Sequence, residues 1–256
     1  MTRQYLDRAR ERVGEEEAAL TAKVDAYRSF IDRVREVPTE SATPEMLTAG
    51  ASPDTRQAPS DKCVAVRTAF AETVRPESVP DGDSEPLVET VRSELSEAVA
   101  ATLAPTGGAV FTDECKRVTL AQAETRQAET GVTRRAVERE AASLESVADT
   151  VDLVRNWLHS ADETPLDELG FEDLRRRHRR LSAFGDRCET AARERQAHLD
   201  RATSRGDLGG VTHRDLVSYL YEGFPVDYPA LVTTASLART CRDCRRVVRA
   251  HLVRRA

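Results

Sequence analysis

Large apolar side chains recur every seven residues near the start of the chain, and this spacing limits what the segment can fold into. One column contains Leu6, Val13, Leu20, Tyr27 and Val34, and a second column begins midway with Val24 and Ile31. A helix over residues 2–36 places both columns on one side, and at 1.5 Å per residue it is roughly 50 Å long. Such a helix is not stable alone, so we predict that a partner helix covers its seam.

The seven-residue spacing returns in two later segments, which we predict to be long helices. The segment from about 113 to 160 carries the column Val137, Leu144, Val151 and Leu158. Thr112 is placed to cap the first turn of that helix. The segment from about 171 to 204 carries Leu174, Leu181 and Cys188. A short, turn-rich connection joins the two segments, so we expect an antiparallel hairpin.

Prolines and glycines divide the chain into five predicted segments. These are a long helix at 1–36, a flexible Pro/Ser/Thr linker at 37–60, short helices and turns at 61–111, the long hairpin at 112–205, and a C-terminal region at 206–256. No stretch of useful length alternates as strands do. The predicted fold is therefore all-α, with long heptad-bearing helices forming an elongated antiparallel coiled-coil bundle and with Pro-rich linkers.

Shorter helices are expected within these segments. We predict helices at about 61–74, at about 85–104 after an N-cap at Ser84, at about 213–222, and at about 228–254 after an N-cap at Asp227. The last of these follows a short helix and an aromatic corner.

The composition favours thin helical packing over a thick core. Leu, Ile, Val and Phe together number 53, about 21% of 256 residues, which is close to the level below which chains are disordered. The basic residues are 35 Arg and only three Lys, a ratio that no structural requirement explains and that is typical of a GC-rich genome. With the net charge of −6, it indicates a halophilic archaeon.

We expect a cytoplasmic protein with no membrane segment. No stretch approaches the length of about 18 uncharged apolar residues that a spanning helix needs. Residues 1–20 carry charges every few positions, unlike a secretory signal peptide. The five cysteines are odd in number and widely spaced, so they do not suggest a disulfide framework.

Two cysteines, Cys241 and Cys244, form a C-R-D-C motif. Thiols at this spacing can form a redox pair or half of a tetrahedral zinc site. A zinc site needs two further ligands, but the other cysteines, Cys63, Cys115 and Cys188, are isolated in the sequence. The motif lies on a predicted packed face with Leu231, Ala235, Ala238, Val248 and Leu252. We therefore favour buried structural thiols, and keep redox and metal roles as alternatives.

The best candidate for nucleic-acid binding is the basic run Arg175, Arg176, Arg177, His178, Arg179 and Arg180. Residues 171–256 carry 18 basic and 11 acidic groups, whereas residues 1–170 carry 20 and 33. Consecutive helical positions spread over all faces, and no aromatic residues are interleaved with the run for base stacking. We favour pairing of this basic half with acidic helices, and keep nucleic-acid or regulatory binding as the alternative function.

No sequence motif indicates catalysis. The chain lacks the P-loop, dinucleotide-binding, nucleophile-elbow and zinc-protease patterns, and its five histidines are dispersed. Long thin helices also form few of the concave, water-excluding pockets that enzymes need. We therefore predict a non-enzymatic protein with no catalytic residue and no cofactor.

Aromatic residues and prolines gather in residues 219–231. The gathered residues are Tyr219, Tyr221, Phe224, Pro225, Tyr228 and Pro229. We predict a corner between two helices, in which the rings pack onto the bundle. The alternative is an aromatic docking patch for a partner.

The same corner carries a family resemblance. The pattern Y-L-Y-x-x-F-P-V-x-Y-P-x-L, the FEDLR segment after a Pro-Leu turn, and R-R-V-V-R-x-H-L near the end resemble a haloarchaeal family of uncharacterised helical proteins, domain of unknown function 7260. The resemblance covers most of the chain and implies a helical protein, but it implies no activity, cofactor or catalytic residue. We predict a scaffold that acts by protein–protein interaction or self-association.

Overall fold

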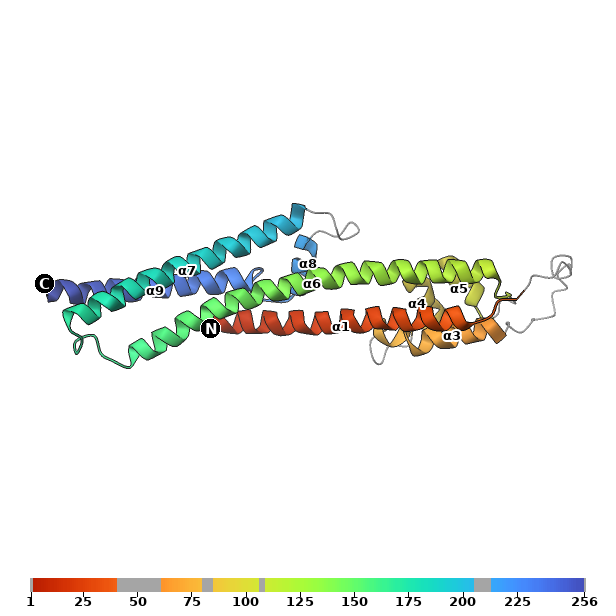
Figure 1. The fold of residues 1–256 in the computed structure, drawn as a ribbon, viewed down its shortest axis with the longest axis horizontal. Helices are drawn as coiled ribbons and strands as arrows, with labels where there is room; N and C mark the ends of the chain where they lie inside the picture. Colours follow the sequence, from red (N-terminus) through yellow and green to blue (C-terminus); the bar gives the residue numbers. More distant parts are fainter. Residues whose placement is uncertain (1, 41–60, 80–84, 106–108, 205–212, 256) are drawn as a thin grey trace. The chain divides into compact units, whose positions relative to one another are not determined.

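All regular structure in the described part of the chain is helical, as predicted. A computed structural model describes residues 2–40, 61–79, 85–105, 109–204 and 213–255 (Figure 1). In chain order its elements are α1 (Thr2–Glu36), α3 (Asp61–Glu72), the 3₁₀-helix η1 (Arg75–Glu77), α4 (Leu87–Glu94), α5 (Glu97–Leu103), α6 (Asp113–Asp162), α7 (Phe171–Ser204), α8 (His213–Leu220) and α9 (Pro229–Arg254). No helix within these ranges combines the length and the apolar character that crossing a membrane requires.

Contacts divide the chain into two compact units. Unit 1 contains residues 1–17 and 135–256, and unit 2 contains residues 18–134. The long helices α1 and α6 each contribute one part to either unit. In α1 the heptad spacing continues across the boundary between residues 17 and 18, so it does not indicate the division there.

The three predicted long helices are confirmed, and local signals set their bounds. Thr112 caps α6, because its Oγ1 accepts a hydrogen bond from the Cys115 N–H at 3.2 Å. The predicted columns are largely buried, with Leu20 and Leu158 half-buried and Leu6, Val13, Tyr27, Val34, Val137, Leu144, Val151, Leu174, Leu181 and Cys188 fully buried.

Unit 2 has an apolar core to which its part of α1, α3, α4, α5 and the first part of α6 contribute. Phe30 and Phe70 are fully buried and meet edge to face, with ring centroids 5.5 Å apart. Val91 and Leu103 from the following short helices join the same cluster. Burial of side chains of this size stabilises a fold by roughly 1.5–3 kcal/mol each, so this core holds the short helices in place.

The helix predicted over residues 85–104 is in fact two helices. α4 ends before Leu95, and α5 begins after Ser96, whose Oγ accepts a hydrogen bond from the Val99 N–H at 3.3 Å. A serine that caps a new first turn competes with continuation of the preceding helix, which explains the break. The predicted N-cap, Ser84, lies outside the described residues, and the N-cap position of α4 is held by Pro86.

Most of the predicted linker at 37–60 lies outside the described residues. Its first residues are described and contact the start of α6. The Glu40 N–H donates to the Phe111 carbonyl at 2.9 Å, and Thr39 Oγ1 donates to Asp113 Oδ1 at 2.6 Å. Residues 37–40 are therefore anchored, and flexibility of residues 41–60 stays a prediction.

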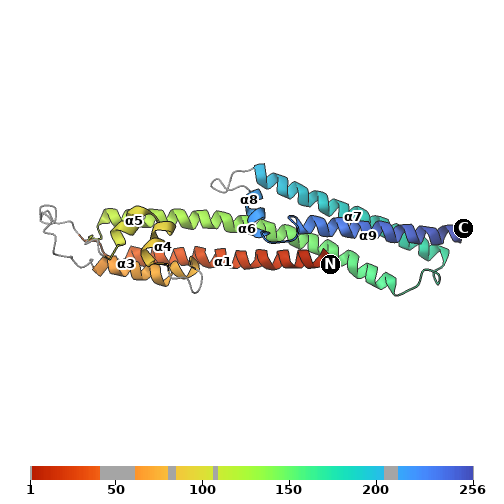
Figure 2. The ribbon, with the colours of Figure 1, turned by 180° about the vertical axis from the view of Figure 1, so that it is seen from behind.

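In unit 1, α7 packs along α9, and both views show the two helices side by side (Figure 1, Figure 2). Leu174 and Leu181 of α7 form a cluster with Val248 of α9. The N-cap of α9 is Tyr228, which makes no side-chain capping bond, so the predicted N-cap at Asp227 is wrong. Proline in the first turn of α9 is confirmed at Pro229.

Candidate functional site

Unit 1 encloses a cluster of polar side chains from three segments. Glu140 of α6, Arg195 of α7 and Tyr221 after α8 are 0%, 3% and 4% exposed. Arg195 Nη1 donates to Glu140 Oε2 at 2.8 Å, and Arg195 Nη2 donates to Glu140 Oε1. The Tyr221 hydroxyl also donates to Glu140 Oε1. One carboxylate therefore ties together segments that are far apart in sequence.

Ser143 and His198, both half-buried, lie at the edge of this cluster. Arg195 Nη1 donates to Ser143 Oγ at 2.9 Å, and His198 Nε2 lies 3.3 Å from Glu140 Oε2. Burial raises the pKa of Tyr221, and the charge of Glu140 raises it further. Burial acts to lower the pKa of Arg195, but the hydrogen bond and charge of Glu140 outweigh it and the pKa lies above its ordinary value. At neutral pH the tyrosine is a neutral donor and the arginine stays charged, as in a structural ion pair.

Sequence reasoning missed this cluster, although a signal was present. Arg195 lies seven residues after Cys188, in the same column as Leu181. Glu140 lies three residues after Val137 and four before Leu144, beside the predicted column of α6. A charged residue at a seam position is rarely buried unless it has a partner, so two such residues on neighbouring helices predict an ion pair.

Unit 2 contains a cluster of similar composition. Lys23 Nζ lies 2.7 Å from Glu94 Oε1, and the Tyr27 hydroxyl donates to Glu94 Oε2 at 2.5 Å. Burial acts to raise the pKa of Glu94, but the hydrogen bonds from Lys23 and Tyr27 outweigh it and the pKa lies below its ordinary value of 4.5. Each unit thus uses one carboxylate, one tyrosine and one basic side chain to join its helices.

The C-R-D-C cysteines do not form a pair with each other in the way that the motif suggests. Cys241 is fully buried and is hydrogen-bonded to Cys188 of α7, whereas Cys244 is half-buried. Cys188, isolated in the sequence, is brought to Cys241 by the packing of α7 on α9. On the same face of α9, Ala235 is exposed, which corrects the predicted packed stripe.

Both thiols of the motif are poor nucleophiles. The hydrogen bond with Cys188 and burial raise the pKa of Cys241, and burial raises the pKa of Cys244. A raised pKa keeps a thiol protonated at neutral pH, and the thiolate is the reactive form. Among the described residues, no group of three or more His, Cys, Asp or Glu side chains is arranged to hold a metal ion.

The aromatic corner is only partly buried. Tyr221 belongs to the buried cluster, and its ring centroid lies 5.5 Å from that of the half-buried Phe224. The Arg8 guanidinium carbon lies 4.6 Å from the centroid of the Phe224 ring. Tyr228 is 36% exposed, so the expectation that its ring is buried is wrong.

Two further members of the corner lie on the surface. Tyr219 is 51% exposed, and its hydroxyl donates to Glu16 Oε2 at 3.1 Å. Pro225 is exposed, whereas Pro229 is buried at the start of α9. The corner therefore contributes both to the interior of unit 1 and to its surface.

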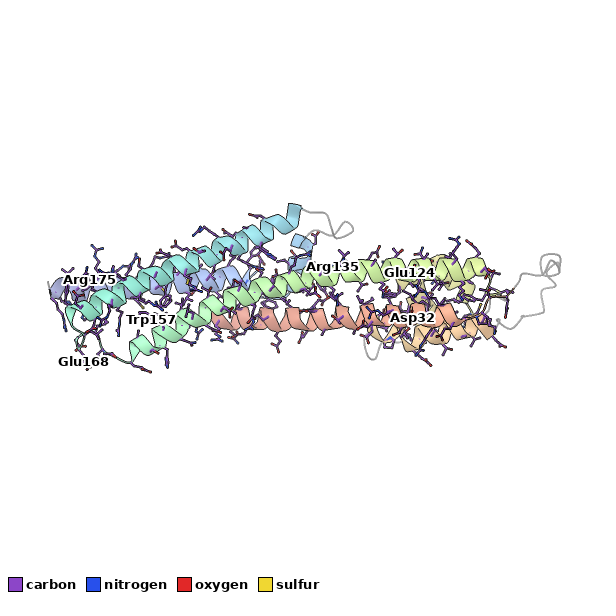
Figure 3. All side chains as sticks on the ribbon, in the orientation of Figure 1. Asp32, Glu124, Arg135, Trp157, Glu168 and Arg175 are labelled. Carbon is purple, nitrogen blue, oxygen red and sulfur yellow. The ribbon has the colours of Figure 1, made fainter. Side chains whose placement is uncertain are left out.

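The basic run of α7 lies beside an aromatic side chain that the sequence did not place there. A groove of about 500 Å³ is lined by Trp157, Arg176, Arg177, Arg179, Arg180 and Ala183. Figure 3 labels Trp157 on α6 and Arg175 near the start of α7. No aromatic residue is interleaved with the run in the sequence, and packing brings Trp157 to it from a different helix.

These features define an all-helical protein whose polar interior consists of ion pairs and hydrogen bonds between helices. The family described as "Domain of unknown function (DUF7260)" matches residues 4–245, and the chain belongs to this family. No curated protein and no solved structure matches the chain. The match confirms the family expected from the aromatic corner.

Proposed function

We propose that the chain is a non-enzymatic helical scaffold that acts through protein–protein contacts. The observation that carries this proposal is the exposed apolar surface of α9. Val247 and Val253 are 52% and 71% exposed, more than any other large apolar side chain of the described residues. In a chain with so few large apolar side chains, two such exposed valines favour a docking surface around the end of α9, and Val253 is the more exposed of the two.

The charges around these valines favour a second copy of the chain as the partner. α9 carries six Arg and one Asp, so two α9 helices would repel each other. Residues 18–134 carry 19 acidic and 13 basic groups, and this excess of acid complements α9. The expected contact is therefore heterologous, with α9 of one copy against the acidic part of the next.

Sedimentation over a concentration series tests this contact. We expect the weight-average mass of the wild-type chain to rise with concentration, and Val253→Glu to abolish the rise. Leu153→Glu is the matched control, because Leu153 is also exposed, at 39%, but lies on α6 in unit 1, outside both proposed contact surfaces. A wild-type chain that stays monomeric at all concentrations, or equal loss in both variants, would contradict the proposal.

The buried polar groups support a role without catalysis. Glu140, Arg195 and Tyr221 form an ion pair and hydrogen bonds inside unit 1, and the Cys241 thiol is hydrogen-bonded to the free thiol of Cys188. These groups hold helices together, and because they are buried they cannot contact a substrate. A protein of this kind functions by presenting surfaces rather than by chemistry at a cleft.

We further propose a cytoplasmic protein of a haloarchaeon whose helices pair as antiparallel coiled coils within each unit. The 35 Arg against three Lys and the net charge of −6 support the salt-adapted origin. The buried seven-residue columns of α6 and α7 support the coiled-coil packing. Thermal unfolding in a KCl series tests the salt adaptation, and a melting temperature that falls toward molar KCl would contradict it.

A further inference from the structure

The groove beside α7 combines an aromatic side chain with several guanidinium groups. Four arginines of α7 and Trp157 of α6 line it. This juxtaposition comes from packing, since Trp157 and Arg176 are far apart in sequence. The groove is lined by α6 and α7 and by no residue of α9, so the inference goes beyond the scaffold function.

The indole of Trp157 is supported from within the protein and remains partly open. Its ring centroid lies 5.2 Å from that of Phe184, with an angle of 57° between the rings. The Arg180 guanidinium carbon lies 4.7 Å from the Phe184 ring centroid. Trp157 is half-buried, so part of a preorganised indole faces the groove.

The arginines of the groove keep donors for an anion. Arg176 pairs with Asp173, and Arg177 donates to the Thr164 carbonyl at 3.3 Å. Each guanidinium has five N–H donors, so these contacts orient the groups and leave other donors open. Arg179 is exposed and has no ion pair or hydrogen bond within the described part of the chain.

We propose that this groove binds single-stranded nucleic acid, with phosphates on the arginines and an unpaired base on Trp157. Guanidinium groups bind phosphate oxygens in a bidentate geometry, and a base stacks on an indole whatever its sequence. Arg176 and Arg180 are four positions apart, about 6 Å along the helix, and offer successive positions for a backbone.

A single strand accounts for both the arginines and the indole of the groove better than other anions do. In a duplex the bases stack on one another and cannot reach the indole. An acidic peptide would pair with the arginines and leave the Trp157 ring without a planar partner.

Tryptophan fluorescence gives a direct test, because Trp157 is the only tryptophan of the chain. The full chain is titrated with an oligothymidylate of about ten nucleotides, within the range of site sizes for single-strand binding. We expect saturable quenching of the indole. The affinity should fall with KCl, with a logarithmic slope of about 0.7 for each phosphate contact.

Two charge-matched double variants locate the site. Arg176→Gln with Arg179→Gln should weaken binding about tenfold or more and reduce the salt slope by about 1.4, which is about 0.7 for each arginine. Arg187→Gln with Arg193→Gln removes the same charge from exposed positions farther along α7 and should change the affinity by less than about twofold. Circular dichroism checks that both variants keep their helices.

Several outcomes would overturn the proposal. One is the absence of saturable quenching by the oligothymidylate at low salt. Another is equal weakening in the two double variants, which would show a diffuse charge effect. Quenching as strong with thymidine monophosphate, with a duplex of the same length or with polyglutamate would instead assign the groove to a free nucleotide, a duplex or an acidic protein.

Discussion

Replacing Arg195 with methionine tests whether the buried cluster of unit 1 holds its helices together. Methionine keeps an unbranched apolar stem of similar length but removes the guanidinium. The variant leaves the Glu140 carboxylate, which is 0% exposed, without its main partner. Tyr221 and His198 remain near the carboxylate, but neither carries the permanent positive charge of arginine.

The expected loss of stability is large because water cannot screen this pair. Side-chain exposures of 2% for Arg195 and 0% for Glu140 place it among buried ion pairs. Removing one partner from such a pair destabilises a protein by about 3–5 kcal/mol. At roughly 2–4 °C per kcal/mol for units of this size, the melting temperature should fall by about 6–20 °C.

Urea unfolding followed by circular dichroism measures this loss, with two controls. Arg242→Met removes the partner of Glu189 from a pair that is 52% and 58% exposed, and should lower the stability by about 1 kcal/mol or less. The triple variant Glu140→Leu, Arg195→Met, Tyr221→Phe removes the charges together, and should recover most of the stability. A loss below about 1 kcal/mol for Arg195→Met, or a triple variant less stable than Arg195→Met alone, would refute the reasoning.

Three further predictions concern the rest of the chain. The pKa of Glu94 is lowered below 4.5, so its contacts stabilise unit 2 above that pH and lose this effect as the pH falls through the folded-state value. The urea midpoint of the wild type should therefore fall between pH 7 and about pH 3 by more than the midpoint of Glu94→Gln does. Phe70→Ala removes a ring that is 0% exposed and should lower the free energy of unfolding by about 3–5 kcal/mol. Phe224→Ala, at a half-buried ring, should lower it by about 1–2 kcal/mol. Equal losses in urea unfolding would contradict the observed burial. Ser96→Ala removes the side-chain cap of α5 and should destabilise unit 2 by about 1 kcal/mol. Urea unfolding measures this loss against Ser29→Ala, an exposed position inside α1.

The sequence by itself determined the helices and most of their ends. A seven-residue column needs only neighbouring turns of one helix to line up, so it can be read from spacing alone. The same holds for Thr112 at the start of α6 and Pro229 at the start of α9, because capping and proline geometry act within one turn. The break at Ser96 is also local, but the continuous stripe of apolar residues around it concealed it.

Only the tertiary structure decided which side chains meet across helices. Glu140 and Arg195, Cys188 and Cys241, and Trp157 and Arg179 are each brought together by the packing of separate helices. Heptad spacing gives each helix a face but not its partner or its register, since apolar seams are similar to one another. Buried charges and thiols restrict that choice, because an unmatched polar group inside a seam is strongly destabilising. The clusters, the division into two units and the groove beside α7 therefore follow from packing, and the sequence indicates only the clusters, as polar residues placed on otherwise apolar seams.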